Sequence, residues 1–116
     1  MSSKDRANLL AILDAIRKIE AFTETIADAE AFHHSEMAFD ATLMDFILIG
    51  EMVERLSTEL KSRYIGTDWQ QIKGFRNLVA HDYLGVDAEE VWQIIHNDLP
   101  RLKEQLTKIV ADLSGQ

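Results

Sequence analysis

The segment 36–64 constrains the fold more than any other, because apolar residues cover most of the circumference it would have as a helix. One stripe recurs at three- and four-residue intervals and contains Met37, Ala41, Met44, Leu48, Met52, Leu56 and Leu60. A neighbouring face carries Phe39, Leu43, Phe46, Ile47 and Val53. A helix this apolar must be buried on more than one side, and in a small bundle the second side is often a subunit interface. We therefore predict a homodimer, with the methionines filling gaps in apolar packing.

Apolar periodicity also predicts a helix over about residues 5–29, followed by a connection over residues 30–35. Ser35 stands where a helix N-cap is expected for the segment that follows. A short helix is predicted to begin after Thr67, which has Gln70 three residues later in the pattern of a capping box, and to run to about His81.

The last helix is predicted to begin at Asp87, with Glu90 in the matching capping-box position. Its apolar stripe stays in phase across Pro100, which predicts one kinked helix or two nearly collinear ones.

One proline and five glycines leave few turns. The expected architecture is all-α: an antiparallel bundle of four to five helices forming a single domain over residues 1–116.

Composition excludes several classes of protein. The chain has no cysteine, so disulfides and zinc–thiolate sites are excluded. Asp45 and Glu51 interrupt the most apolar stretch, which therefore falls short of the ~18 apolar residues of a membrane span. The first residues carry no apolar signal region, so we expect a cytoplasmic protein without membrane attachment.

Charge is unevenly distributed. The net charge of −8 argues against sequence-blind wrapping of nucleic acid. Residues 61–81 nevertheless carry +3, which leaves −11 for the remainder; the charged residues are Lys61, Arg63, Lys73 and Arg76 against Asp68 alone. A basic segment in an acidic chain suits a local phosphate site, a docking patch for an acidic partner or a chance fluctuation.

Arg76 and His81 are the residue types that RNA cleavage without a metal requires. A base must take the proton of the 2′-hydroxyl, an acid must protonate the leaving 5′-oxygen, and a fixed cation must stabilise the phosphorane. Histidine serves either proton role near neutral pH. Arginine offers a planar, permanently charged fork that binds phosphate oxygens.

Helix geometry complicates this pairing. Five residues on a continuous helix separate Arg76 from His81 by about 140°. The helix must therefore end before His81, or two subunits must assemble the working pair. The alternative is that Arg76, His81 and Asp82 make ordinary surface ion pairs and contacts with the helix terminus.

The order of several motifs resembles that of HEPN-domain toxins of the HepT type. Arg76, His81 and Tyr83 follow the spacing Arg-x4-His-x-Tyr, with Asn77 next to the arginine. Further matching segments occur in family order over essentially the whole chain: 49–51, 56–57, 69–72 and 86–87 with 91–92. Together these positions are more specific than a lone Arg-x4-His.

The resemblance implies a homodimeric helical bundle in which two Arg-x4-His motifs meet at a cleft. It implies a metal-independent endoribonuclease, the toxin of a type VII-like toxin–antitoxin system, with Arg76 and His81 catalytic and Asn77 a polar helper. It requires no cofactor. The partner it implies is an antitoxin of the MntA type, a nucleotidyltransferase that transfers AMP to Tyr83. Added bulk and phosphate charge at the mouth of the cleft would then exclude RNA.

Two alternatives bear on this interpretation. Glu30 and His33 have the spacing of half a di-iron carboxylate motif, but no second copy exists, and we interpret His33 and His34 as solvated loop residues rather than metal ligands. A different function class is a non-catalytic HEPN module that binds a nucleotidyltransferase and assists it.

Overall fold

The computed structural model describes residues 3–80 and 85–115, and over these residues the chain is helical without a β-strand, which confirms the all-α prediction. The elements are α1 (Ser3–Thr23), α2 (Ala29–His34), α3 (Glu36–Arg55), α4 (Thr58–Arg63), α5 (Trp69–Ala80), α6 (Ala88–Gln93), η2 (Ile94–Asp98) and α7 (Leu99–Ser114). In this part of the chain no helix is both long and apolar enough to cross a membrane.

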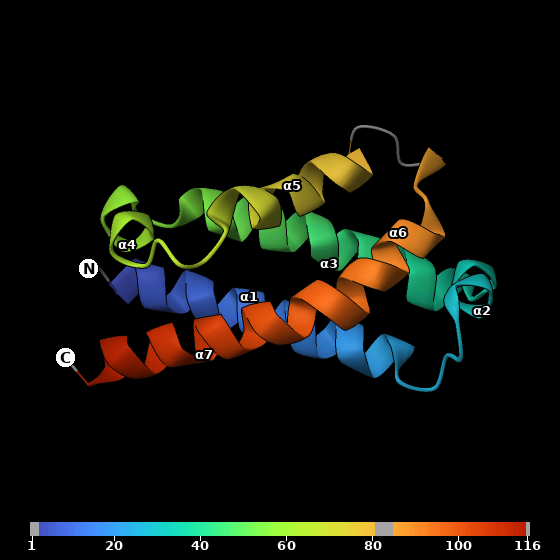
Figure 1. Ribbon diagram of the computed structural model, residues 1–116, viewed down its shortest axis with the longest axis horizontal. Helices are drawn as coiled ribbons and strands as arrows, with labels where there is room; N and C mark the ends of the chain where they lie inside the picture. The colour runs from blue at the N-terminus through green and yellow to red at the C-terminus, as the bar shows by residue number, and fades with distance from the viewer. Residues whose placement is uncertain (1–2, 81–84, 116) are drawn as a thin grey trace.

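The long helices form one bundle with α3 between α1 and α5 and with α7 packed along α1 (Figure 1). Both termini lie at one end, and the short helices α2 and α6 pack together at the other. Apolar side chains from each long helix meet in one core. The last turns of α5 point toward the α2–α6 end, away from the termini (Figure 1).

The segment 36–64 was predicted to be one helix, but it forms two, α3 and α4. Leu56 is extended (φ −67°, ψ 143°), and α4 begins after Ser57, whose hydroxyl accepts the Leu60 N–H at 3.1 Å. Asp5, buried in α1, accepts from the Ser57 N–H at 2.9 Å and from its hydroxyl at 2.6 Å. The tertiary hydrogen bonds to Asp5 stabilise the break, which helix periodicity alone does not reveal.

The predicted connection over residues 30–35 is also wrong, because α2 occupies most of it. Asp28 caps this short helix by accepting the Ala31 N–H at 2.9 Å. Ser35 does stand at the N-cap position of α3, but its hydroxyl donates to the Ala31 carbonyl at 2.7 Å and makes no cap bond. His33 and His34 end α2 as exposed side chains, so they are solvated but not in a loop.

The predicted N-cap residue is wrong at the start of α5 and confirmed at the start of α6. At α5 the capping oxygen belongs to Asp68, which accepts the Gln71 N–H at 3.0 Å, whereas the predicted Thr67 is buried. At α6 Asp87 is the N-cap, as predicted, and accepts the Glu89 N–H at 2.9 Å.

The chain stays helical across Pro100, which confirms the prediction of a kinked helix or collinear helices. The turn before the proline is π-helical, and the Leu99 N–H donates to the Ile94 carbonyl five residues earlier. A proline lacks the N–H of a regular turn, and its ring crowds the carbonyl four residues back, so a wider turn at this point relieves both problems.

One face of α3 is uncovered in the single chain. Met37 is 88% exposed, Met44 63% and Leu48 38%, whereas Met52 is buried. The interpretation of the methionines as gap-fillers is therefore wrong for Met37 and Met44 within one chain. Whether a second subunit covers this face stays a prediction.

Candidate functional site

Arg76 lies on α5, and the residues around it fix that helix on α3. Ile72, Phe75 and Val79 are buried, at the three- and four-residue spacing of one helix face. Phe75 stacks on Phe46 of α3 with ring centroids 5.2 Å apart and planes 25° apart. We call the contact between α3 and α5 the seam. The apolar pattern of α5 leaves Arg76 and its neighbour Asn77 exposed at the edge of this seam.

Gly50 of α3 lies directly against Arg76. A Cβ atom at residue 50 would stand 2.4 Å from the Arg76 Cβ, 3.1 Å from its backbone nitrogen and 3.3 Å from its Cα. Real Cβ atoms essentially never approach a neighbour that closely. The absence of a side chain at residue 50 is thus what allows α5 to approach α3 so closely at the arginine.

Glu51 forms an ion pair with Arg76 across the same seam. Arg76 Nε lies 2.5 Å from Glu51 Oε1, with the two side chains 49% and 39% exposed. One turn earlier on α5, Lys73 Nζ lies 3.1 Å from Glu54 Oε2. Two cations of the basic segment are therefore paired with carboxylates of α3, so its positive charge is less free than the sequence suggested.

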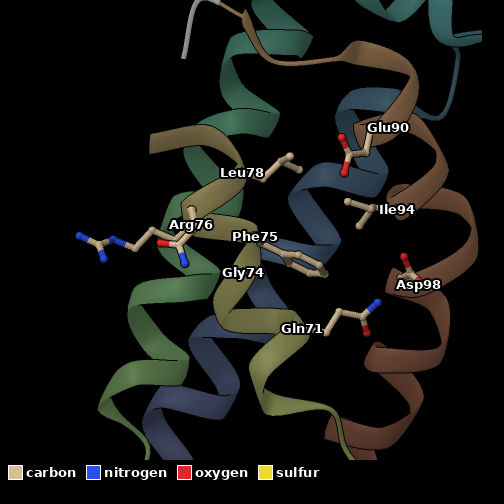
Figure 2. A pocket seen from close by; sticks show the side chains of 9 residues that line it. Gln71, Gly74, Phe75, Arg76, Leu78, Glu90, Ile94 and Asp98 are labelled. Carbon is tan, nitrogen blue, oxygen red and sulfur yellow. The ribbon is translucent and has the colours of Figure 1, made fainter. Parts of the chain in front are cut away.

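A cleft of about 940 Å³ opens on the other side of α5, between that helix and α6–η2 (Figure 2). Apolar and polar side chains both line it: Gln71, Gly74, Phe75, Arg76, Asn77, Leu78, Glu90, Ile94 and Asp98. The Arg76 guanidinium points away from this cleft, toward the opposite side of α5 (Figure 2). The cation and the cleft are thus on different sides of the same helix.

His81 and Tyr83 lie outside the described residues, so their meeting with Arg76 at one cleft stays a prediction. Of the predicted site residues, the structure places Arg76 and Asn77 side by side on exposed positions of α5. Over residues 3–80 and 85–115, no group of three or more metal-binding side chains is arranged to hold a metal ion.

Gly50 and Glu51 are the functional candidates whose roles the sequence interpretation missed. The sequence places both in a segment of the family order and shows Glu51 as a charge within an apolar stretch, but neither observation indicates a contact with Arg76. The available signal was a glycine in the middle of an apolar helix, which costs about 1 kcal/mol relative to alanine and often marks a close approach of another backbone. The acidic residue that follows it faces the incoming helix.

Comparison with known proteins gives a consistent family assignment. The family model described as ribonuclease HepT-like matches residues 12–109. A "Putative RNase" of Methanocaldococcus jannaschii is 28% identical over 107 residues, covering 91% of this chain and 97% of that protein. The "Probable ribonuclease HepT" of Thermococcus cleftensis is 28% identical over 98 residues, covering 84% of this chain and 88% of that protein.

A longer relative shares the same region. The M. jannaschii protein named "Gamma-glutamylcyclotransferase and putative RNase" is 30% identical over 102 residues; the match covers 88% of this chain but 46% of that protein. No solved structure matches the chain.

Proposed function

The chain belongs to the ribonuclease HepT-like family, and we propose that it is a metal-independent RNA endonuclease whose catalytic groups are Arg76 and His81. One imidazole takes the proton of the 2′-hydroxyl as that oxygen attacks phosphorus. A second, protonated imidazole donates to the 5′-oxygen as its bond to phosphorus breaks. The guanidinium stabilises the charge of the phosphorane between these two events.

The observation that carries this proposal is the presentation of Arg76. Its side chain is half exposed at the edge of the α3–α5 seam, inside the Arg-x4-His-x-Tyr motif that the family match spans. A fixed, permanently charged fork of this kind suits a phosphodiester. The acidity of the remainder of the chain does not oppose this function, because cleavage requires only a local site.

A second copy of the chain completes the proposed site. The mechanism uses two imidazoles, and the motif contributes one per chain. The uncovered α3 face of Met37, Met44 and Leu48 supplies an apolar surface for self-association. Glu51 lies about two turns beyond Met44 on this side of the helix, so the face leads toward the Arg76 ion pair. Two-fold pairing along α3 would therefore bring two arginines toward one another.

Regulation by a nucleotidyltransferase forms the remaining part of the proposal. As in toxin–antitoxin pairs of the HepT type, an MntA-like partner transfers AMP to Tyr83, two residues beyond His81. The added phosphate repels RNA and the nucleoside blocks access to the motif. Intact mass after co-expression with such a partner, compared with a Tyr83→Phe variant, measures this modification directly.

The test of the cleavage proposal is His81→Ala against the parent and against His34→Ala. His34 is an exposed histidine on α2, outside the motif, and serves as the matched control. We expect His81→Ala to lose cleavage of a single-stranded RNA probe and growth inhibition while the helical content and dimer persist. His34→Ala should retain both activities. Cleavage by His81→Ala at the rate of the parent would overturn the assignment. A parent that binds a nucleotidyltransferase yet cuts no RNA would support the non-catalytic module instead.

A further inference from the structure

We propose that Glu51 is a positioning residue that orients the Arg76 guanidinium for phosphate, an inference that rests on the proposed ribonuclease function. The observation behind it is which nitrogen the carboxylate contacts. Glu51 Oε1 lies 2.5 Å from Nε, the nitrogen nearest the α5 backbone. The carboxylate thus engages the Nε edge of the guanidinium, and we assign the two terminal nitrogens to phosphate.

The contact also selects how a phosphate binds. A guanidinium binds an oxyanion either side-on, through Nε and one terminal nitrogen, or end-on, through both terminal nitrogens. With the Glu51 carboxylate against Nε, a phosphate is expected to bind in the end-on mode. The guanidinium already extends away from the α5 cleft (Figure 2). Glu51 therefore presents the fork outward in one orientation.

Gly50 makes this arrangement possible. The Arg76 backbone lies directly against residue 50, so the Cβ atom of the arginine is close to the α3 backbone. The carboxylate of the next residue on α3 then reaches the first nitrogen of the guanidinium. If α5 were further from α3, Glu51 would contact the terminal nitrogens of Arg76 instead of Nε. Those nitrogens would then not be available to bind phosphate.

Folding stability does not account for this ion pair. Both side chains are 39% exposed or more, and ion pairs in such positions contribute little to stability. Orientation of a catalytic cation is a different matter, because a displacement of about 1 Å can cost ~100-fold in rate. The same seam contains a matched comparison in Glu54 and Lys73, which are also half exposed and form a separate ion pair between the same two helices.

The kinetic test compares Glu51→Ala, Glu51→Gln and Glu54→Ala on a fluorophore–quencher single-stranded RNA of mixed sequence. Glu51→Ala should lower kcat about 10- to 100-fold with a smaller change in KM. Glu51→Gln keeps an acceptor oxygen and should stay within ~3-fold of the parent, and Glu54→Ala should match the parent. In an Arg76→Lys background, which lacks the Nε donor, adding Glu51→Ala should change little.

Three kinetic outcomes contradict the inference. If Glu51→Ala has the kcat of the parent, Glu51 does not position Arg76 for cleavage. Equal damage in Glu51→Gln and Glu51→Ala shows that charge rather than orientation is required. Faster cleavage by Glu51→Ala shows that the carboxylate competes with phosphate for the guanidinium. If Glu51→Ala is parent-like while His81→Ala is inactive, this inference fails and the ribonuclease proposal stands.

An NMR measurement keeps the inference testable even if the parent cuts no RNA. The Arg76 Nε–H signal of the parent should be protected from water exchange, and Glu51→Ala should lose that protection while Glu54→Ala retains it. Addition of a non-cleavable 2′-O-methyl RNA should shift the terminal nitrogens more than Nε. An Nε–H that exchanges equally fast in the parent and in Glu51→Ala overturns the inference, whatever the cleavage assay gives.

Discussion

The helix that carries Arg76 is packed closely on one side and open on the other. Toward α3, a Cβ atom at residue 50 would collide with Arg76, and Phe75 stacks on Phe46. Toward α6 and η2, a cleft of about 940 Å³ separates the helices, and a Cβ atom at Gly74 would meet nothing within 4 Å. Over the described residues, α5 packs chiefly on α3. The position of Arg76 is therefore set by α3, while the cleft side can change with little effect on that position.

Truncation of an aromatic side chain at the seam should have the largest effect. Phe46 is fully buried, so Phe46→Ala should lower the free energy of unfolding by about 3–5 kcal/mol. Ile94 lines the cleft and is only partly buried, so Ile94→Ala should cost ~1 kcal/mol. Urea denaturation of both variants measures the difference. Equal losses would mean that the cleft side contributes as much to the fold as the seam.

A methyl group at residue 50 should have the next largest effect. Gly50→Ala places a Cβ atom 2.4 Å from the Arg76 Cβ, and α5 must move away from α3 to accept it. Overpacking of this kind costs about 1–3 kcal/mol, more than alanine gains in helix propensity. Urea denaturation should show the loss, and the RNA cleavage rate should fall with it because Arg76 moves. Unchanged stability and rate would contradict the close approach.

The same substitution on the open side should have the opposite sign. Gly74→Ala meets no neighbouring atom and gains the helix propensity of alanine, so stability should rise by about 0.5–1 kcal/mol. The cleavage rate should be preserved, since the α3 seam is unaffected. Thermal unfolding of this variant beside Gly50→Ala gives a matched pair; a loss in both would show that α5 tolerates no change on either side.

The sequence predicted the parts of this molecule that depend on local pattern. The all-α class, the Asp87 cap and the continuity across Pro100 follow from apolar periodicity and from side chains near the helix ends. The predictions that failed depend on long-range contacts. The break at Ser57 depends on Asp5, 52 residues away in sequence. Ser35 and Thr67 have the right chemistry for a cap, but nearby Asp side chains or a backbone carbonyl determine the outcome.

The candidate site divides in the same way. Arg76 was predicted from residue type and spacing, because its chemistry is intrinsic. Gly50 and Glu51 acquire their roles only when α3 and α5 cross at this point, so the motif alone does not indicate them. The exposure of Met37 and Met44 likewise depends on which faces of α3 are taken by α1 and α5.

The smallest effect on stability is expected for Asp45, which lies on α3 near Lys18 and Asp14 of α1. Burial raises the pKa of the Asp45 carboxyl; Lys18 nearby opposes the shift, and Asp14 adds to it. The folded chain therefore binds this proton more tightly than the unfolded chain. The contribution of Asp45 to stability is present below the unfolded pKa and is lost as pH rises through the higher folded value. Asp45→Asn should gain slightly over the parent near neutral pH, and the gain should shrink as pH falls from the raised folded pKa toward the ordinary carboxyl value. Urea denaturation at several pH values measures this, and a gain that stays constant with pH would show that packing rather than ionisation causes it.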